Sequence, residues 1–298
     1  VNEIRDRDEA VSIMVDKANI AADTIKNNYD CCVAYYDEHL LEISIEQRRL
    51  LGEFEPALQN DEFVMYLQPQ VKRDGAAKGA EALVRWVHPS RGILTPYAFI
   101  DILENAGLIY KLDLYIWEKA AQKLAEWKEK GYGSYHISVN ISTKDFYIID
   151  IYETFTGLIN KYGIAASNLH LEITETTLMT DFEKNMNIIH KLQGVGFRVE
   201  IDDFGSGYSS LNMLKDISAD VLKIDMGFLR KSENEVKGQD ILESIITLAG
   251  KIGMDVITEG VETKKQLDML TMMGCHEFQG YYFSKPVPVS EFEEKYLV

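Results

Sequence analysis

The chain has 298 residues, a formal net charge of −17 and 46% hydrophobic residues. That apolar fraction supports a folded, well-cored protein and excludes a disordered one. The acidic charge argues against a nucleic-acid polymer as partner, because such polymers bind basic surfaces that displace their counterions. An anionic substrate would therefore need something cationic in the site that receives it.

Cysteine usage and apolar patterning indicate the cellular compartment. Cys31, Cys32 and Cys275 lack the spacing of a metal site or of a disulfide framework, so we expect a reducing cytoplasm. The apolar runs are short and interrupted by charge, so we expect no segment to span or contact a membrane, and no signal peptide is recognisable. Because the chain begins at Val1 without an initiator methionine, we expect a longer parent protein, whose upstream part could be anchored in a membrane.

The first 60 or so residues differ from the rest of the chain. Amphipathic patterns predict helices at Ala10–Lys26 and Glu42–Leu58, with a tyrosine-rich segment, Tyr29–Tyr36, between them. We interpret this part as a helical linker that packs on the following domain and has no chemistry of its own. The predicted domains are therefore residues 1–50 and 51–298.

From Phe63 onward, short β-type runs alternate with longer helical ones. The strands are expected at Phe63–Gln68, Ala80–Trp86, Tyr135–Asn140, Leu169–Thr174, Phe197–Asp202, Val221–Asp225, Asp255–Glu259 and His276–Gln279. The clearest helical patterns are Leu112–Lys130, Phe182–Gln193, Asp240–Ile252 and Lys264–Met273. Eight strands with helices between them predict an α/β fold, a TIM-type (β/α)8 barrel.

Polar residues recur within or at the ends of these strands, where catalytic groups of such barrels cluster. They are Glu81, Asn140, Glu172, Asp202, Asp203, Lys223, Asp225, Glu259 and Gln279. Taken alone, Asp225 is better explained as a helix N-cap, and for Asn140 a structural and a functional role are equally plausible. A structural role does not explain the whole set, because six carboxylates at one end of a barrel would repel one another and take up protons unless positive charge compensates them.

Divalent cations are the simplest compensation for this charge. Carboxylate and carboxamide oxygens, without His or Cys, favour Mg²⁺ or Mn²⁺ over zinc. The adjacent Asp202 and Asp203 indicate two ions, since one carboxylate can bridge them. Two neighbouring ions recur in enzymes that catalyse displacement at phosphorus, and they would make an acidic barrel mouth receptive to a phosphodiester.

Two further features lie beside these acids. Lys223 is the one cation among them, and a core-facing lysine without a partner would be costly, so we predict that it orients the attacking water or the phosphate. The glycine-rich segment Phe204–Ser210 would alone indicate only a tight turn, but directly after two candidate ligands it predicts a lid or an interface loop. The histidines follow no ligand spacing, and we assign them no chemistry.

These residues stand in motifs that resemble those of the EAL-domain cyclic di-GMP phosphodiesterases, from about Phe54 to the C-terminus. The motifs are Glu81–Trp86, Val139–Ser142, Glu172–Glu175, Asp202–Ser210, Lys223–Asp225, Glu259–Glu262 and Gln279–Gly280. Each motif is weak alone, but their occurrence in order on successive strands is specific. The resemblance implies a barrel whose first strand is antiparallel to the others, and hydrolysis of one phosphodiester bond of cyclic di-GMP to linear pGpG.

The resemblance also implies a role for each residue. One ion would be held by Glu81, Asn140, Glu172 and Asp202, and the second by Asp202, Asp203 and Glu259. Lys223 would bind the nucleophilic water, with Glu259 as a candidate general base and with Asp225 and Gln279 supporting the site. Gln68 and Arg85 resemble substrate-contacting positions. Glu175 resembles the residue that anchors the glycine-rich loop, which in this family links homodimer formation to activity.

Departures from the family pattern are slight. Ser206 stands where Thr or Ala is usual, and Thr258 stands where Ala is common, but neither change removes a ligand. Residues 18–37 resemble the end of a GGDEF domain, although the GGDEF signature is absent, so we expect no cyclase activity. The alternative function is a non-hydrolytic cyclic di-GMP receptor module, against which the complete ligand set argues. A glycosidase-type carboxylate pair would explain two of the acids but not the whole set.

Overall fold

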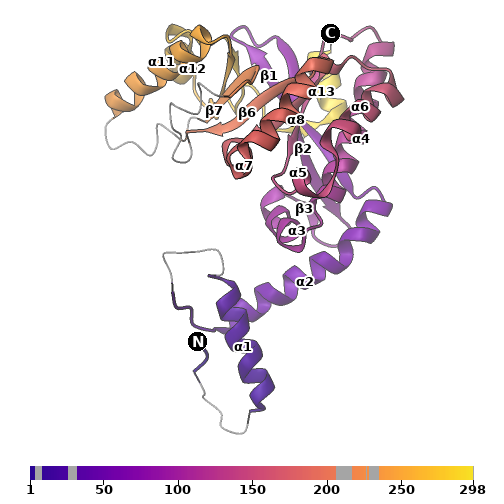
Figure 1. The fold of residues 1–298 in the computed structure, drawn as a ribbon, viewed down its shortest axis with the longest axis vertical. Coiled ribbons are helices and arrows are strands. Elements are labelled where there is room, and N and C mark those ends of the chain that lie inside the picture. Colours follow the sequence, from indigo (N-terminus) through magenta and orange to yellow (C-terminus); the bar gives the residue numbers. More distant parts are fainter. Residues whose placement is uncertain (4–8, 26–31, 206–216, 226, 228–234, 298) are drawn as a thin grey trace.

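The computed structural model describes residues 1–3, 9–25, 32–205, 217–225, 227 and 235–297 (Figure 1). Within them, eight strands close into a barrel: β1 (Phe63–Lys72), β2 (Ala77–His88), β4 (His136–Ile141), β5 (Leu169–Thr174), β6 (Arg198–Phe204), β7 (Val221–Asp225), β8 (Asp255–Glu259) and β9 (Glu277–Phe278). Their order around the barrel is β1–β2–β4–β5–β6–β7–β8–β9, and β9 pairs back with β1. The predicted α/β barrel is confirmed.

Strand β1 runs antiparallel to both of its neighbours, β2 and β9, whereas the other neighbouring pairs around the barrel are parallel. A tight turn joins β1 to β2, in which Gly75 adopts φ 85° and its N–H donates to the carbonyl of Lys72. Two short strands, β3 (Gly92–Leu94) and β10 (Val287–Pro288), extend the sheet beside β2 and β1. The antiparallel first strand implied by the motifs is therefore present.

Helices surround the strands, and the apolar core lies between the two layers. The helices are α3 (Ile100–Ala106), α4 (Ile109–Glu129), α5 (Asp145–Ile148), α6 (Ile151–Tyr162), α7 (Glu175–Thr180), α8 (Phe182–Val195), α11 (Glu235–Lys251), α12 (Lys264–Met272) and α13 (Val289–Tyr296), with 3-10 turns at Pro96–Ala98 and Ala166–Asn168. In β4, Ile137, Val139 and Ile141 belong to this core. Because side chains alternate along a strand, the residues between them point into the barrel.

The N-terminal part consists of α1 (Val11–Asp23) and α2 (Glu38–Gln59), close to the predicted helices. The C-terminal half of α2 packs on the barrel: Leu50 and Phe54 are buried, and the Phe54 ring lies 5.6 Å from that of Phe63. Helix α1 lies beside the other half of α2, away from the barrel (Figure 1). The predicted packing of this linker therefore holds for α2. The division at residue 50 and the GGDEF likeness stay predictions.

Among the described residues, none of the helices combines the length and the apolar character that a bilayer crossing requires.

Candidate active site

A buried lysine lies at the centre of the predicted site. Lys223, the third residue of β7, has no exposed surface. Its Nζ lies 2.8 Å from Oε2 of Glu172 and 2.8 Å from Oε1 of Glu259. The same nitrogen lies 3.3 Å from Oδ1 of Asp202 and 3.5 Å from Oε2 of Glu81. Four different strands thus deliver one carboxylate each to one ammonium group, as the strand-end pattern predicted; we refer to these five residues as the lysine-centred cluster.

Two predicted amide side chains, Asn140 and Gln279, hold Glu81 in this cluster, and a third, Gln68, contacts Gln279. The Nδ2 of Asn140 donates to Oε1 of Glu81 at 3.2 Å, and the Nε2 of Gln279 donates to Oε2 at 2.5 Å. Gln279 also donates to Oε1 of Gln68 at 3.3 Å, and Gln68 donates to the carbonyl of Ser284. Gln68 lies directly opposite Glu81 in the β1–β2 ladder. The carboxylate of Glu81 is therefore fixed by groups from two other strands or their ends.

Strand β6 is irregular at its two aspartates. The register with β7 shifts between Ile201 and Phe204, and Asp203 adopts φ 56°, in the left-handed region. In a regular strand Asp202 and Asp203 would point to opposite faces, whereas a bulge can re-aim one of them. Holding a non-glycine residue there costs on the order of 1–3 kcal/mol, and such strain gathers at functional sites. Loss of hydration and the charge of Asp202 raise the pKa of Asp203, as expected for two carboxylates at one mouth.

Burial and like charges make ionisation of these acids costly. Burial raises the pKa of Glu172 well above its usual range, and Glu81 raises it further. Burial likewise raises the pKa of Glu259 to about 8, against the opposing effect of Lys223. Burial opposes the charge of Lys223 too, but the surrounding carboxylates, Asp202 foremost, hold its pKa well above the usual range. If all are ionised, four carboxylates and one ammonium leave a formal charge of −3.

The buried carboxylate oxygens of the cluster suit a further cation. Among the described residues, Oε1 of Glu172 is buried and has neither a hydrogen bond nor an ion pair, whereas Oε2 of Glu172, Oδ1 of Asp202 and Oε1 of Glu259 are buried, accept no hydrogen bond and share the single ammonium of Lys223. Buried acceptors without partners are rare in folded proteins and indicate an ion, a water molecule or a catalytic role. All these donor atoms are oxygens, which hard cations such as Mg²⁺ and Mn²⁺ prefer. The residues therefore fit the predicted divalent ions.

Arg85 projects from β2 beyond Glu81. Its Nη1 donates to the carbonyl of Val84 at 2.7 Å, and its guanidinium lies 5.5 Å from the centre of the Tyr66 ring. Partial burial lowers the pKa of Arg85, while Tyr66, Tyr281 and Glu81 oppose this effect. A guanidinium on an aromatic face beside the acids suits contact with a nucleotide phosphate or base.

The remaining predicted residues lie at the ends of β5 and β7. Asp225 ends β7 and accepts a hydrogen bond from the N–H of Gly227 at 2.6 Å, so it stabilises a local turn and also raises the pKa of nearby Asp203. Glu175 begins α7 directly after Thr174, which caps that helix. Of the predicted glycine-rich loop, residues 206–210 lie outside the described residues.

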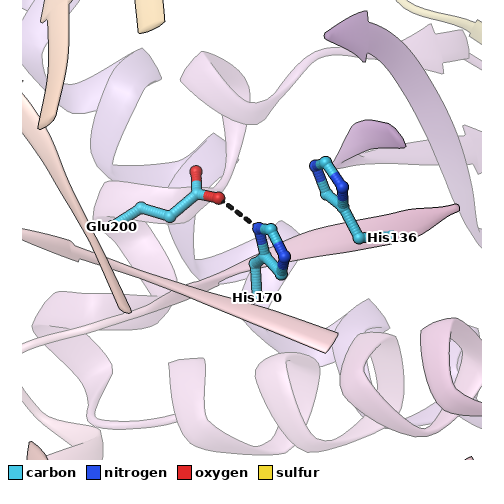
Figure 2. A group of neighbouring side chains, drawn as sticks. All are labelled: His136, His170 and Glu200. Atoms are coloured by element: carbon cyan, nitrogen blue, oxygen red, sulfur yellow. Dashed lines mark hydrogen bonds and ion pairs between the residues drawn. The ribbon is translucent and has the colours of Figure 1, made fainter. Parts of the chain in front are cut away.

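A second polar cluster lies at the opposite ends of the strands, and sequence reasoning missed it. His136 and His170 stack with ring centres 3.8 Å apart and planes 4° apart, and Nδ1 of His170 lies 2.5 Å from Oε1 of Glu200 (Figure 2). No local spacing connects these residues, because they come from three neighbouring strands. Strand alternation could have found them: His170 precedes Glu172 by two residues, and Glu200 precedes Asp202 by two. The assignment of no chemistry to the histidines overlooked this proximity.

The closed barrel with one antiparallel strand and a lysine-centred acidic mouth defines the class of protein. A family model described as the EAL domain matches residues 52–286, and the chain belongs to that family. It is 32% identical over 272 residues to the bifunctional diguanylate cyclase/cyclic di-GMP phosphodiesterase MucR of Pseudomonas aeruginosa, covering 91% of this chain and 39% of that protein. It is 33% identical over 240 residues to the cyclic di-GMP phosphodiesterase PdeR of Escherichia coli, covering 80% of this chain and 36% of that protein.

Solved structures agree with this assignment. The PaMucR phosphodiesterase in complex with c-di-GMP is 33% identical, with a TM-score of 0.77, over 82% of this chain and 99% of that one. The EAL enzyme Bd1971, with cAMP and cyclic di-GMP bound, is 28% identical, with a TM-score of 0.78, over 95% and 74% of the two chains. The chain spans about two fifths of the length of the curated relatives named above.

Proposed function

We propose that this chain is a phosphodiesterase that hydrolyses one phosphodiester bond of cyclic di-GMP, releases linear pGpG and depends on two divalent cations, Mg²⁺ or Mn²⁺. The observation that carries the proposal is the lysine-centred cluster, in which four carboxylates share one ammonium and Oε1 of Glu172 is buried without a hydrogen-bond or ion-pair partner within the described residues. The two relatives named above, 32% and 33% identical to this chain, carry cyclic di-GMP phosphodiesterase in their names, and this motivates the choice of substrate.

The ion ligands in this proposal divide into two sets. Glu81, Asn140, Glu172 and Asp202 would hold one ion, and Asp202, Asp203 and Glu259 would hold the second. When bound, such ions neutralise charge on the phosphodiester and supply an activated water. Gln279 contributes by fixing the carboxylate of Glu81 through its 2.5 Å hydrogen bond, and Asp225 by supporting the turn after β7.

The chain's own groups would then position and deprotonate the nucleophile. Lys223 and Glu259, 2.8 Å apart, face the same space. Lys223 orients the water, and Glu259 accepts its proton as the water oxygen attacks phosphorus. The bond from phosphorus to the 3′-oxygen of the ribose breaks, and that oxygen takes a proton from solvent. The products are a 5′-phosphate and a free 3′-hydroxyl group, as in linear pGpG.

Substrate contacts and regulation complete the proposal. Gln68 and Arg85 line the mouth beside Glu81 and would contact the dinucleotide. Glu175, at the start of α7, would anchor the loop after β6 and connect it to a homodimer interface. We also place the chain in the cytoplasm, in keeping with the free thiols of Cys32 and Cys275.

Chromatography of cyclic di-GMP after incubation with the chain tests the function. We expect pGpG to appear with Mg²⁺ or Mn²⁺ and not with a chelator. Glu81→Ala should abolish turnover, because it removes a ligand that the amides of Asn140 and Gln279 hold in place, whereas Glu183→Ala, on an exposed position of α8, should leave it unchanged. If calorimetry shows that cyclic di-GMP binds but chromatography shows that it stays intact at all metal concentrations, the proposed enzymatic activity is wrong and the chain is a receptor module.

A further inference from the structure

Two histidines and one glutamate, drawn in Figure 2, come from the beginnings of β4, β5 and β6, the end of the barrel opposite to the lysine-centred cluster. His136, His170 and Glu200 are 8%, 4% and 0% exposed. Each offers a donor atom, and these atoms all lie within 4.8 Å of one another. Because Glu200 precedes Asp202 by two residues on β6 and strands rise about 3.3 Å per residue, the two clusters are separated by roughly 7 Å along the strand.

The hydrogen bonds of the two rings indicate which nitrogen of each ring would face a metal ion, namely Nδ1 of His136 and Nδ1 of His170. Gln70 donates its amide N–H to Ser138, so its carbonyl oxygen accepts from Nε2 of His136 at 2.6 Å. His136 is neutral, because burial lowers its pKa well below the usual value, and its Nδ1 therefore carries a lone pair. In His170, Nε2 lies 3.2 Å from the carbonyl of Ser167, and Nδ1 faces Glu200. Metal-binding histidines characteristically donate their second N–H to such an oxygen.

The glutamate has a second oxygen available for an ion, and the Lys78 and Arg198 side chains near it are already paired with acids. Oε2 of Glu200 is buried and has no hydrogen-bond partner among the described residues. A cavity of about 480 Å³ is lined by all three residues of the cluster and gives room for a water ligand. The two cations on its wall are already paired, Lys78 with Glu277 and Arg198 with Asp255 at 2.6 Å.

We infer that His136, His170 and Glu200 form a second, transition-metal site of the Zn²⁺ type, distinct in place and chemistry from the carboxylate site. Two imidazoles and one carboxylate suit Zn²⁺ and not Mg²⁺, and a water can complete four ligands. An ion lies in the plane of each ring that binds it, so one of the stacked rings must turn about its Cβ–Cγ bond, a torsion with broad minima. The ion then takes the place of the proton between His170 and Glu200.

The test uses the whole chain with millimolar Mg²⁺ present, so that the carboxylate site is saturated. Zn²⁺ is titrated against a chromophoric chelator, and the zinc-loaded chain is measured by X-ray absorption. We expect one tightly held Zn²⁺ per chain with two imidazoles in its coordination shell, a signature that the candidate catalytic ligands cannot give. His136→Asn, His170→Asn and Glu200→Gln should each weaken binding at least about tenfold, by analogy with the loss of a supporting group.

His190→Asn is the matched control, because His190 is exposed on α8 and should not affect affinity. If a cluster variant does not fold, the X-ray absorption spectrum of the unmodified chain still shows whether imidazoles bind the zinc. Zinc that binds without imidazole ligands, no zinc retained in excess Mg²⁺, or equal affinity in folded cluster variants would each overturn the site.

Discussion

Lys223→Met is the substitution that most directly examines the lysine-centred cluster. Methionine has a similar length and no charge, so it removes the ammonium group while keeping most of the volume. In the chain without divalent ions, Glu172 and Glu259 each lose a fully buried cation 2.8 Å away. These carboxylates must then either stay ionised without compensation or take up protons.

The size of the effect follows from burial. Removing one partner of a buried ion pair costs about 3–5 kcal/mol. For a chain of this size, at about 2 °C per kcal/mol, the unfolding temperature should fall by roughly 6–10 °C. Millimolar Mg²⁺ should reduce this deficit, because it would supply the lost positive charge.

The sign of the pH dependence can be worked out from the same acids. Burial raises the pKa of Glu172, and that of Glu259 to about 8, above the value of about 4.3 in an unfolded chain. A raised pKa in the folded state means that the stability contributed by the protonated acid is present at low pH and is lost as pH rises toward 8. Without Lys223 these pKa values rise further, so the variant should approach wild-type stability at pH 5 and fall furthest below it at pH 8.

Urea unfolding with a chelator at pH 5, 7 and 8, followed by circular dichroism, measures the effect. Lys161→Met is the control, because Lys161 pairs with Glu118 at an exposed position and its removal should leave the midpoint unchanged. Equal midpoints for wild type and Lys223→Met at pH 8 would refute the role of Lys223 as the counter-charge of the cluster.

Three further substitutions examine the mouth and its surroundings. Glu175→Ala should lower turnover in the chromatographic assay while calorimetry still detects binding of cyclic di-GMP, and wild-type turnover would contradict its role as a loop anchor. Arg85→Ala should weaken that binding at least about tenfold, in line with 1.5–3 kcal/mol for a hydrogen bond to a charged group, and unchanged affinity in calorimetry would remove Arg85 from the site. Asp113→Asn should stabilise the chain increasingly as pH rises from 5 to 9 in urea unfolding. Burial, together with Asp145, raises the pKa of Asp113 well above its usual value, so the acid contributes stability only while protonated. A lower midpoint for Asp113→Asn at pH 9 would show that its charge is compensated.

The strands were predictable where their pattern is local. Leu169–Thr174, Val221–Asp225 and Asp255–Glu259 match the predicted bounds because each alternates or runs apolar between clear breaks. Strand β1 was predicted to end at Gln68 but continues to Lys72, since its pairing with β2 carries it past Pro69. Helix α6 is not among the clearest predicted helical patterns, because it is rich in β-branched and aromatic residues of low helix propensity.

Helix α6 forms for reasons that lie outside the local pattern. The side chain of Asp150 caps its first turn by accepting a hydrogen bond from the N–H of Glu153, and Ile151 and Phe155 are buried against the barrel. Tertiary burial of one face thus overrides the weak intrinsic preference.

The site was predictable to the extent that strand ends determine it. Alternation brings Glu81, Glu172, Lys223 and Glu259 to one place, and the structure gathers them. The irregularity at Asp203 could not be predicted, because a bulge depends on the register with a neighbouring strand. The histidine cluster could not be predicted from ligand spacing for a similar reason. Such spacing relates residues within one segment, whereas His136, His170 and Glu200 lie on three adjacent strands.

The polar interior of the barrel has a consequence for how its two ends interact. Barrels of this type usually fill their interior with branched apolar side chains, whereas here Gln70, Ser138 and Glu200 are buried on inward positions beneath Glu172 and Lys223.

Lys223, at the centre of one cluster, also acts electrostatically on Glu200 in the other. Burial opposes the charge of Glu200, but the hydrogen bond and charge of His170, together with the charge of Lys223, lower its pKa to about 2. Glu200 in turn raises the pKa of Glu172 above it. A charge added at the histidine end therefore changes the field at the carboxylates of the lysine-centred cluster through groups that are already in electrostatic contact. Since a buried, low-dielectric interior screens such effects weakly, an ion bound by His136, His170 and Glu200 would alter the protonation of the lysine-centred cluster without touching the substrate.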